Sequence, residues 1–159
     1  MNEQLVAIPG IPQALHRGYE DLPWVSLVDG VSFQLLQVNV ESALWVLRTR
    51  FAPGVTVQRH KHTGEVYAFT LSGAWRYLEY PEINRAGSYL FEPAGSVHTL
   101  HALADNDADT EVWFAIRGAN LNLTPEGKVE SVTDAAKILQ VYERECAARG
   151  LPRPNVIRA

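Results

Sequence analysis

A succession of short apolar runs without a helical period constrains the fold of this chain most strongly. Between residues 31 and 118, runs rich in Val, Leu, Trp, Tyr and Phe are separated by Gly, Pro, Asn or Asp. Runs of this composition favour β-strands, and their spacing of about 8 to 12 residues is typical of a sandwich or barrel rather than of βαβ units. The predicted strands lie in VSFQLLQVNV, SALWVLRTRF, EVYAFTLS, AWRYLEY, GSYLFEP and TEVWFAIRG.

The length of 159 residues fits a single domain, residues 1–159, with an all-β core over about residues 31–120. Residues 1–30 are rich in Pro and Gly, which predicts an extended N-terminal arm. One C-terminal helix is predicted over about residues 134–148, with Thr133 as N-cap and Gly150 as stop signal. Its apolar stripe would be Ala136, Leu139, Tyr142 and Cys146.

The composition excludes several classes of function. The net charge is −4, from 14 basic and 18 acidic residues spread along the chain, so neither nucleic acid nor an anionic membrane is an expected partner. No apolar stretch is long enough to span a membrane, and the N-terminus lacks the features of a signal peptide, so we expect a cytoplasmic protein. The only cysteine, Cys146, permits neither an intrachain disulfide nor a thiolate metal cluster.

Candidate metal ligands lie in two segments. In GVTVQRHKH, His60 and His62 stand two residues apart, which on a strand directs both imidazoles to one face. In GSYLFEPAGSVH, His98 follows a Pro-x-Gly turn and begins a strand that can lie opposite the first. Three neutral imidazoles suit Zn(II), Cu(II), Fe(II) or Ni(II). The sequence therefore predicts one divalent metal held by His60, His62 and His98.

These two segments resemble the two conserved motifs of the cupin superfamily. The first gives Gly54, five residues and then His60-Lys61-His62, and the second gives Gly87, five residues, a Pro-x-Gly turn, two residues and His98. The resemblance implies a jelly-roll β-barrel. The first motif ordinarily carries a glutamate ligand where this chain has Val66. The adjacent Glu65 would lie on the opposite strand face and could bind the metal only through a bulge.

The resemblance extends beyond the motifs. The stretches HKHTGEVYAFTLSGAWRYLEY, GSYLFEPAGSVHTL and GANLNLTPEGKVESVTDAAKILQVYE are similar to consecutive blocks of the 2,4'-dihydroxyacetophenone dioxygenases and, more distantly, of the acetylacetone-cleaving (β-diketone) dioxygenases. This likeness implies an Fe(II) enzyme that uses O2 to cleave a C–C bond next to a carbonyl, in a hydroxyketone or β-diketone bound as its enolate. A homo-oligomer is also expected, as for cupins generally.

Glu79 is the candidate catalytic residue of the sequence. Glu79 shares a strand face with Trp75 and Tyr77, and because an acidic residue seldom accompanies two aromatics on a solvent face, we expect it to point inward. There it could hydrogen-bond a metal-bound water or take the acidic proton of a substrate. The alternative is a surface glutamate paired with Arg76 or Arg48.

Two other functions fit the same histidines. One is a non-redox lyase or isomerase with Zn(II) or Mn(II), since zinc also accepts three histidines and an open position. The other is a non-catalytic cupin that binds a small molecule or a metal, related to the cupin halves of some anti-sigma factors.

Overall fold

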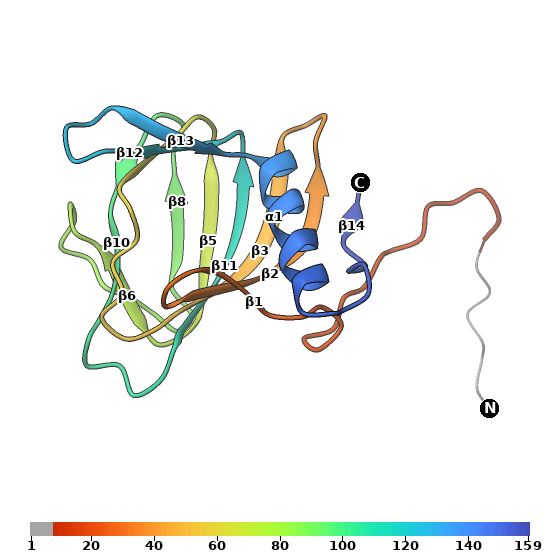
Figure 1. Cartoon of the computed structure of the whole chain (residues 1–159), viewed down its shortest axis with the longest axis horizontal. Coiled ribbons are helices and arrows are strands. Elements are labelled where there is room, and N and C mark those ends of the chain that lie inside the picture. The colour runs from red at the N-terminus through yellow and green to blue at the C-terminus, as the bar shows by residue number, and fades with distance from the viewer. Residues whose placement is uncertain (1–7) are drawn as a thin grey trace.

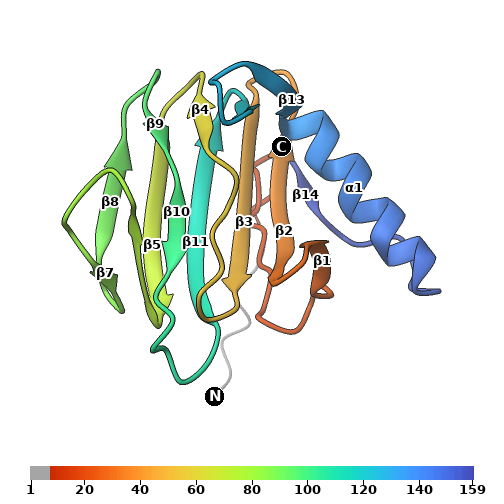
Figure 2. The same cartoon turned by 60° about the vertical axis from the view of Figure 1, so that its left-hand side comes forward.

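A computed structural model describes residues 8–159, and its main element is a seven-stranded, largely antiparallel sheet. Figure 1 and Figure 2 show this sheet as one layer of a β-sandwich, with the smaller sheets as the other. The order of its strands is β1 (Val25–Val28), β2 (Val31–Asn39), β3 (Leu44–Phe51), β11 (Thr110–Arg117), β5 (Val66–Ser72) and β8 (Tyr89–Glu92), and β14 (Ile157–Arg158) pairs in parallel with β2.

Two smaller sheets form the facing layer. The first contains β10 (Leu100–Ala102), β6 (Ala74–Tyr77) and β7 (Asn84–Arg85). The second contains β13 (Val129–Thr133), β12 (Asn120–Leu123), β4 (His60–His62) and β9 (Val97–His98). This arrangement is the cupin β-sandwich, and it confirms the predicted all-β fold.

Strict alternation along the central strands builds the core. In β11, Val112, Phe114 and Ile116 are buried while their neighbours are partly exposed, because successive side chains of a strand point to opposite faces. Phe114 pairs with Leu47 of β3, and Trp75 of the opposite layer is fully buried near the Phe114 ring. All six predicted strand segments contain a strand of the structure. The β12–β13 hairpin was not predicted, since its half-buried, Asn- and Ser-containing strands lack a clear apolar alternation.

The C-terminal helix α1 (Ala135–Ala148) packs on β2 and β1 (Figure 1). Its N-cap is Asp134, whose side chain accepts a hydrogen bond from Lys137 N at 2.8 Å. The predicted cap, Thr133, is wrong by one residue because Thr133 still belongs to β13, where it pairs with Asn120. The stripe prediction was also wrong at Ala136, which is exposed, whereas Leu139 is partly buried against the core. The residues that the helix buries are Ala135, Ile138, Tyr142 and Cys146.

The described part of the N-terminal arm is attached to the sandwich by specific contacts. Leu22 is buried, and the buried side chain of Gln34 donates hydrogen bonds to the carbonyls of Leu22 and Tyr19, at 2.6 and 2.8 Å. Tyr142 of the helix donates to Pro23 O at 2.6 Å. The rest of the predicted arm, residues 1–7, lies outside the described residues. None of the helices within residues 8–159 has the length and apolarity needed to cross a membrane.

Candidate metal centre

The three predicted histidines lie side by side at one end of the facing layer. His60 and His62 are buried on β4 with exposed Lys61 between them, as strand alternation requires. His98 on β9 is the direct antiparallel partner of His60. The ring centroids of His60 and His62 are 4.8 Å apart, those of His62 and His98 5.4 Å, and those of His60 and His98 6.2 Å. The structure thus places together the three histidines that the spacing argument singled out.

The Pro-x-Gly turn that begins at Pro93 holds the two histidine strands in register. Gly95 has a φ of 87°, in the left-handed region that glycine adopts without strain. Its backbone N–H donates to His62 O at 2.8 Å, and His62 N donates back to Ser96 O at 3.0 Å. These paired bonds position His98, two residues beyond Ser96, against β4.

A fourth potential ligand is Glu92, which the sequence reasoning missed. This side chain is 2 % exposed, and its Oε2 lies 2.7 Å from His62 Nε2 and 3.2 Å from His98 Nε2. His62, Glu92 and His98 form a buried set whose ligand atoms all lie within 4.8 Å of one another. The inference that the centre lacks a carboxylate is thus corrected.

Register explains how the carboxylate is replaced. Val66 on β5 is fully buried and stands directly opposite Glu92 on β8 in the antiparallel ladder. Directly paired residues have their Cβ atoms about 5 Å apart on the same face. The acid that the motif places at position 66 is therefore supplied by the neighbouring strand. Strand alternation along the chain could not have indicated this, because a turn at Pro93–Ser96 separates Glu92 from His98; only the β5–β8 pairing reveals it.

The donor set fits a divalent cation. Both ring nitrogens of His62, Oε2 of Glu92 and Nδ1 of His98 are buried without a hydrogen-bond partner, and the close approach of His62 to Glu92 lacks hydrogen-bond geometry. Buried polar atoms are seldom left unpaired, and a cation shared by one ring nitrogen of His62 and Oε2 of Glu92 would satisfy both of those atoms. His60 Nδ1 lies 2.9 Å from the carbonyl of Gln58, so this nitrogen carries the proton and Nε2 is free to bind a metal.

Electrostatics keep His60 and Glu92 in the protonation states that a metal requires. Burial, together with the nearby charge of His62, lowers the pKa of His60 to about 4, so His60 is neutral at pH 7. Burial by itself would raise the pKa of Glu92, but the contacts with His62 and His98 outweigh it and lower that pKa to about 2. Metals bind neutral imidazole and ionised carboxylate. His60 and Glu92 are therefore in the neutral and the ionised form, respectively, before a metal binds.

Tyr77 at the end of β6 supports this arrangement. Its hydroxyl donates a hydrogen bond to Glu92 Oε1, the carboxylate oxygen that does not face the histidines. Its ring stacks on the His98 ring with a centroid distance of 4.2 Å and an interplanar angle of 16°. Burial and the charge of Glu92 raise the pKa of Tyr77 well above its ordinary value, so the hydroxyl remains a donor.

The two other glutamates considered from the sequence lie outside the cluster. Glu79 is exposed, and its carboxylate accepts hydrogen bonds from Thr99 N at 2.8 Å and Thr99 Oγ1 at 2.7 Å. The expectation that it points inward is wrong, because β6 ends at Tyr77 and a turn follows. Glu65 lies 3.5 Å from Arg117 at the surface, as the strand alternation indicated.

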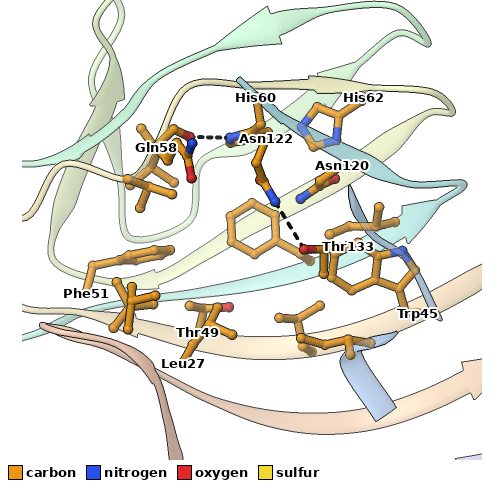
Figure 3. Close-up of a pocket in the computed structure, with 18 of the residues that line it drawn as sticks. Leu27, Trp45, Thr49, Phe51, Gln58, His60, His62, Asn120, Asn122 and Thr133 are labelled. Carbon is orange, nitrogen blue, oxygen red and sulfur yellow. Dashed lines mark hydrogen bonds between the residues drawn. The ribbon is translucent and has the colours of Figure 1, made fainter. Parts of the chain in front are cut away.

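Two cavities reach the cluster from different sides. One of about 310 Å³ lies inside the sandwich and touches His60 and His62 (Figure 3). The other, of about 550 Å³, touches His98 and Glu92. Tyr77 lines both. A ligand in the inner cavity would therefore meet the metal from the His60 and His62 side.

The comparisons with known proteins agree with this geometry. Residues 13–119 match the model of the ChrR cupin-like domain. A protein of unknown function with a cupin-like fold from Ralstonia eutropha JMP134 is 38% identical, with 82% of this chain and 80% of that chain covered and a TM-score of 0.76. The search of curated proteins finds no match.

Two more distant structures carry functional names. The acetylacetone dioxygenase of Acinetobacter johnsonii is 17% identical, with 88% of this chain and 97% of that chain covered and a TM-score of 0.73. The complex of SigE with the anti-sigma ChrR of Rhodobacter sphaeroides matches at 24% identity, with 63% of this chain and 51% of that chain covered and a TM-score of 0.53. At these identities the likeness shows the fold alone.

Proposed function

The chain belongs to the ChrR cupin-like domain family, and from that premise we propose that it is an Fe(II)-dependent dioxygenase. Its substrate is a hydroxyketone or β-diketone, bound as the enolate, and the reaction cleaves the C–C bond next to the carbonyl. The observation that carries the proposal is a buried His and Glu donor set that reaches the wall of a mostly apolar cavity through His62. The acetylacetone dioxygenase among the structures with this fold supports the choice of chemistry.

The donor set suits a ketone that has lost a proton. His60, His62 and His98 would hold the metal, with Glu92 as a fourth ligand or as the hydrogen-bond partner of a metal ligand. Together with a divalent ion, three neutral imidazoles and one carboxylate leave a charge of about +1, which one enolate neutralises. A bound iron ion would supply the redox chemistry with O2, which side chains cannot supply.

The chain's own residues provide orientation and a dry surrounding. Tyr77 fixes one oxygen of Glu92 by a hydrogen bond, so the other oxygen stays directed at the histidines. Leu47, Phe114 and Ile116 contribute apolar surface to the inner cavity, which excludes water from the reacting group. The reaction needs no further reductant. A hydroxyketone R–CO–CH2OH and O2 yield R–COOH and HCOOH, with one oxygen atom added to each carbon of the broken bond.

Oxygen consumption tests the proposal. Protein loaded with Fe(II) under anaerobic conditions is mixed with oxygenated 2,4'-dihydroxyacetophenone or pentane-2,4-dione, and oxygen uptake and acid products are followed together. With at least one of the two substrates, we expect one substrate molecule to be cleaved for each O2 molecule consumed, with release of a carboxylic acid. A matched control is the Glu79→Gln variant, whose altered side chain is exposed. No uptake with either compound or with related diketones would refute the dioxygenase.

A non-redox enzyme is the second candidate, and Glu92 favours it specifically. Mixed imidazole and carboxylate ligands also suit Zn(II) and Mn(II), and such a site can polarise a carbonyl in a lyase or isomerase. Metal analysis of protein purified without added metal separates the two candidates. Zinc or manganese at one equivalent, with no oxygen uptake after iron loading, would support this alternative.

A non-catalytic role is a third candidate, and its support is that the matching domain is named after the anti-sigma factor ChrR. In that case the protein would bind a metal or small molecule without turnover. The expected homo-oligomer and the cytoplasmic location remain predictions, which size-exclusion chromatography with light scattering and fractionation of cells would check.

A further inference from the structure

The β12–β13 hairpin forms the polar wall of the inner cavity. Asn120 on β12 pairs directly with His62 on β4, and Asn122 pairs with His60. Residues that pair directly across a ladder present their side chains on one face. Figure 3 accordingly shows the two asparagine side chains beside the two histidines, at the same cavity. Each cavity-facing histidine thus has an amide as its immediate neighbour.

The asparagines differ in how far their hydrogen bonds are satisfied. Asn122 Nδ2 donates to Ser131 Oγ at 3.0 Å and to Thr133 Oγ1 at 3.2 Å, so β13 fixes its orientation. In contrast, Asn120 Oδ1 is buried and has no hydrogen-bond partner. A buried amide oxygen without a partner is costly, and it is often completed by a ligand. Asn120 therefore has unused hydrogen-bonding capacity directly next to the metal cluster.

The remaining cavity wall is uncharged. Apart from the two histidines, the described residues that line it are apolar or carry only amide and hydroxyl groups, with no Asp, Glu, Lys or Arg among them. Opposite the histidines stand Trp45, Thr49 and Phe51 of β3 (Figure 3). A charge buried on the ligand here would find no counter-ion except the metal. The volume of about 310 Å³ corresponds to about ten non-hydrogen atoms, if each occupies about the share of one water molecule.

We propose that Asn120 and Asn122 select the ligand of the inner cavity. The ligand is a molecule of about ten non-hydrogen atoms that is uncharged outside its metal-binding group. That group carries a hydroxyl, which donates a hydrogen bond to Asn120 Oδ1, while Asn122, whose Nδ2 is committed to β13, forms the polar wall beside it. Asn120 is the specificity-determining residue because its bond is made only with the ligand. The inference rests on the proposed function in one respect, that the ligand binds through a metal held by the cluster.

Calorimetric titration of Zn(II)-loaded protein tests this inference without turnover. The probes are 2-hydroxyacetophenone, 1-phenylbutane-1,3-dione and the 4-carboxylated form of 2-hydroxyacetophenone. We expect at least one neutral probe to bind, and the carboxylated form to bind at least about 100-fold more weakly, since its carboxylate would be buried without a partner. In Asn120→Leu the affinity for 2-hydroxyacetophenone, the neutral probe that carries a hydroxyl donor, should fall about tenfold, the size expected for one lost hydrogen bond.

Two controls separate this inference from the metal site. Zn(II) affinity is measured first in every variant, and it should be unchanged in Asn120→Leu. Gln140→Ala removes an exposed helix amide and should change neither affinity. Asn120→Ala serves if the leucine variant does not fold. Failure to bind Zn(II) would refute the proposed function. If Zn(II) binds normally, three results would overturn the inference alone. Neither neutral probe binds, the carboxylated probe binds as tightly as the neutral ones, or replacement of Asn120 leaves the probe affinity unchanged.

Discussion

Replacing Glu92 by glutamine tests the carboxylate that the neighbouring strand supplies. The change keeps the shape of the side chain and removes its negative charge. In the protein the pKa of Glu92 is about 2 against an ordinary 4.5, because contacts with the histidines outweigh its burial. This difference is worth about 3 kcal/mol in favour of the charged form. A divalent cation between the same groups should attract the carboxylate at least as strongly as the histidines do.

We therefore expect Glu92→Gln to weaken divalent metal binding by about 100-fold, which is the same 3 kcal/mol expressed as an affinity ratio. The assay is competition for Zn(II) or Co(II) with a chromophoric chelator at pH 7, where the carboxylate is fully ionised. Glu79→Gln is a matched control, since it makes the same chemical change at an exposed position hydrogen-bonded to Thr99. Its affinity should equal that of the unmodified protein.

The reasoning fails if Glu92→Gln and Glu79→Gln bind the metal equally well while both are folded by circular dichroism. Equal binding would mean that the three histidines suffice and that Glu92 has only a packing role. The Co(II) absorption spectrum adds an independent check. Loss of a carboxylate from the coordination shell should shift the visible bands in Glu92→Gln and leave those of the control unchanged.

Three further predictions concern the same cluster. Glu92→Val alone should lose metal affinity. The double variant Val66→Glu/Glu92→Val, which moves the acid to the facing position on β5, should bind the metal within about tenfold of the unmodified protein, and the same competition assay measures both variants. Because the pKa of His60 is about 4 when folded and 6.5 ordinarily, the unfolded metal-free chain binds more protons between these pH values. The free energy of unfolding should therefore fall by about 3 kcal/mol as pH falls from 6.5 to 4, and urea titrations with chelator present should show a flatter profile for His60→Gln. Tyr77→Phe keeps the stack on His98 but leaves Glu92 Oε1 without its hydrogen-bond donor. We therefore expect the free energy of unfolding to fall by about 1 to 3 kcal/mol in the same urea titrations. An unchanged stability would contradict the role assigned to that hydrogen bond.

The local sequence pattern was sufficient to predict most of the fold and the proximity of the three histidines. The convergence of His60 and His62 depends only on strand alternation, and the turn at Gly95 positions His98 through its own backbone bonds. Glu79 was misplaced because alternation holds only while the strand continues. The chain turns after Tyr77, where Tyr80 N donates to Tyr77 O at 3.1 Å.

The residues that were missed depend on pairing between segments distant in sequence. Asn120 and Asn122 matter because β12 lies against β4, and nothing within GANLNL indicates this neighbour. The same holds for Glu92, whose position opposite Val66 is fixed by the register of β5 and β8. A shift of that register by one residue would direct Glu92 away from the histidines. Side-chain direction can be predicted within a strand, but the partner that a side chain meets cannot.

The exchange of an acid between β5 and β8 changes how the donor set of such a site should be counted. A motif lists the ligands along one strand, whereas a metal ion can contact side chains from adjacent strands that share one face of the sheet. Val66 and Glu92 are directly paired on such a face. A count along the motif alone gives three neutral ligands and a centre of charge +2 once a divalent ion binds. A count across the ladder adds the buried anion and gives +1, which favours a singly charged enolate over a dianionic ligand. The same count fits the uncharged cavity wall. The carboxylate and the enolate together neutralise the divalent ion, so a further charge on the ligand would have no partner among the residues that line the cavity.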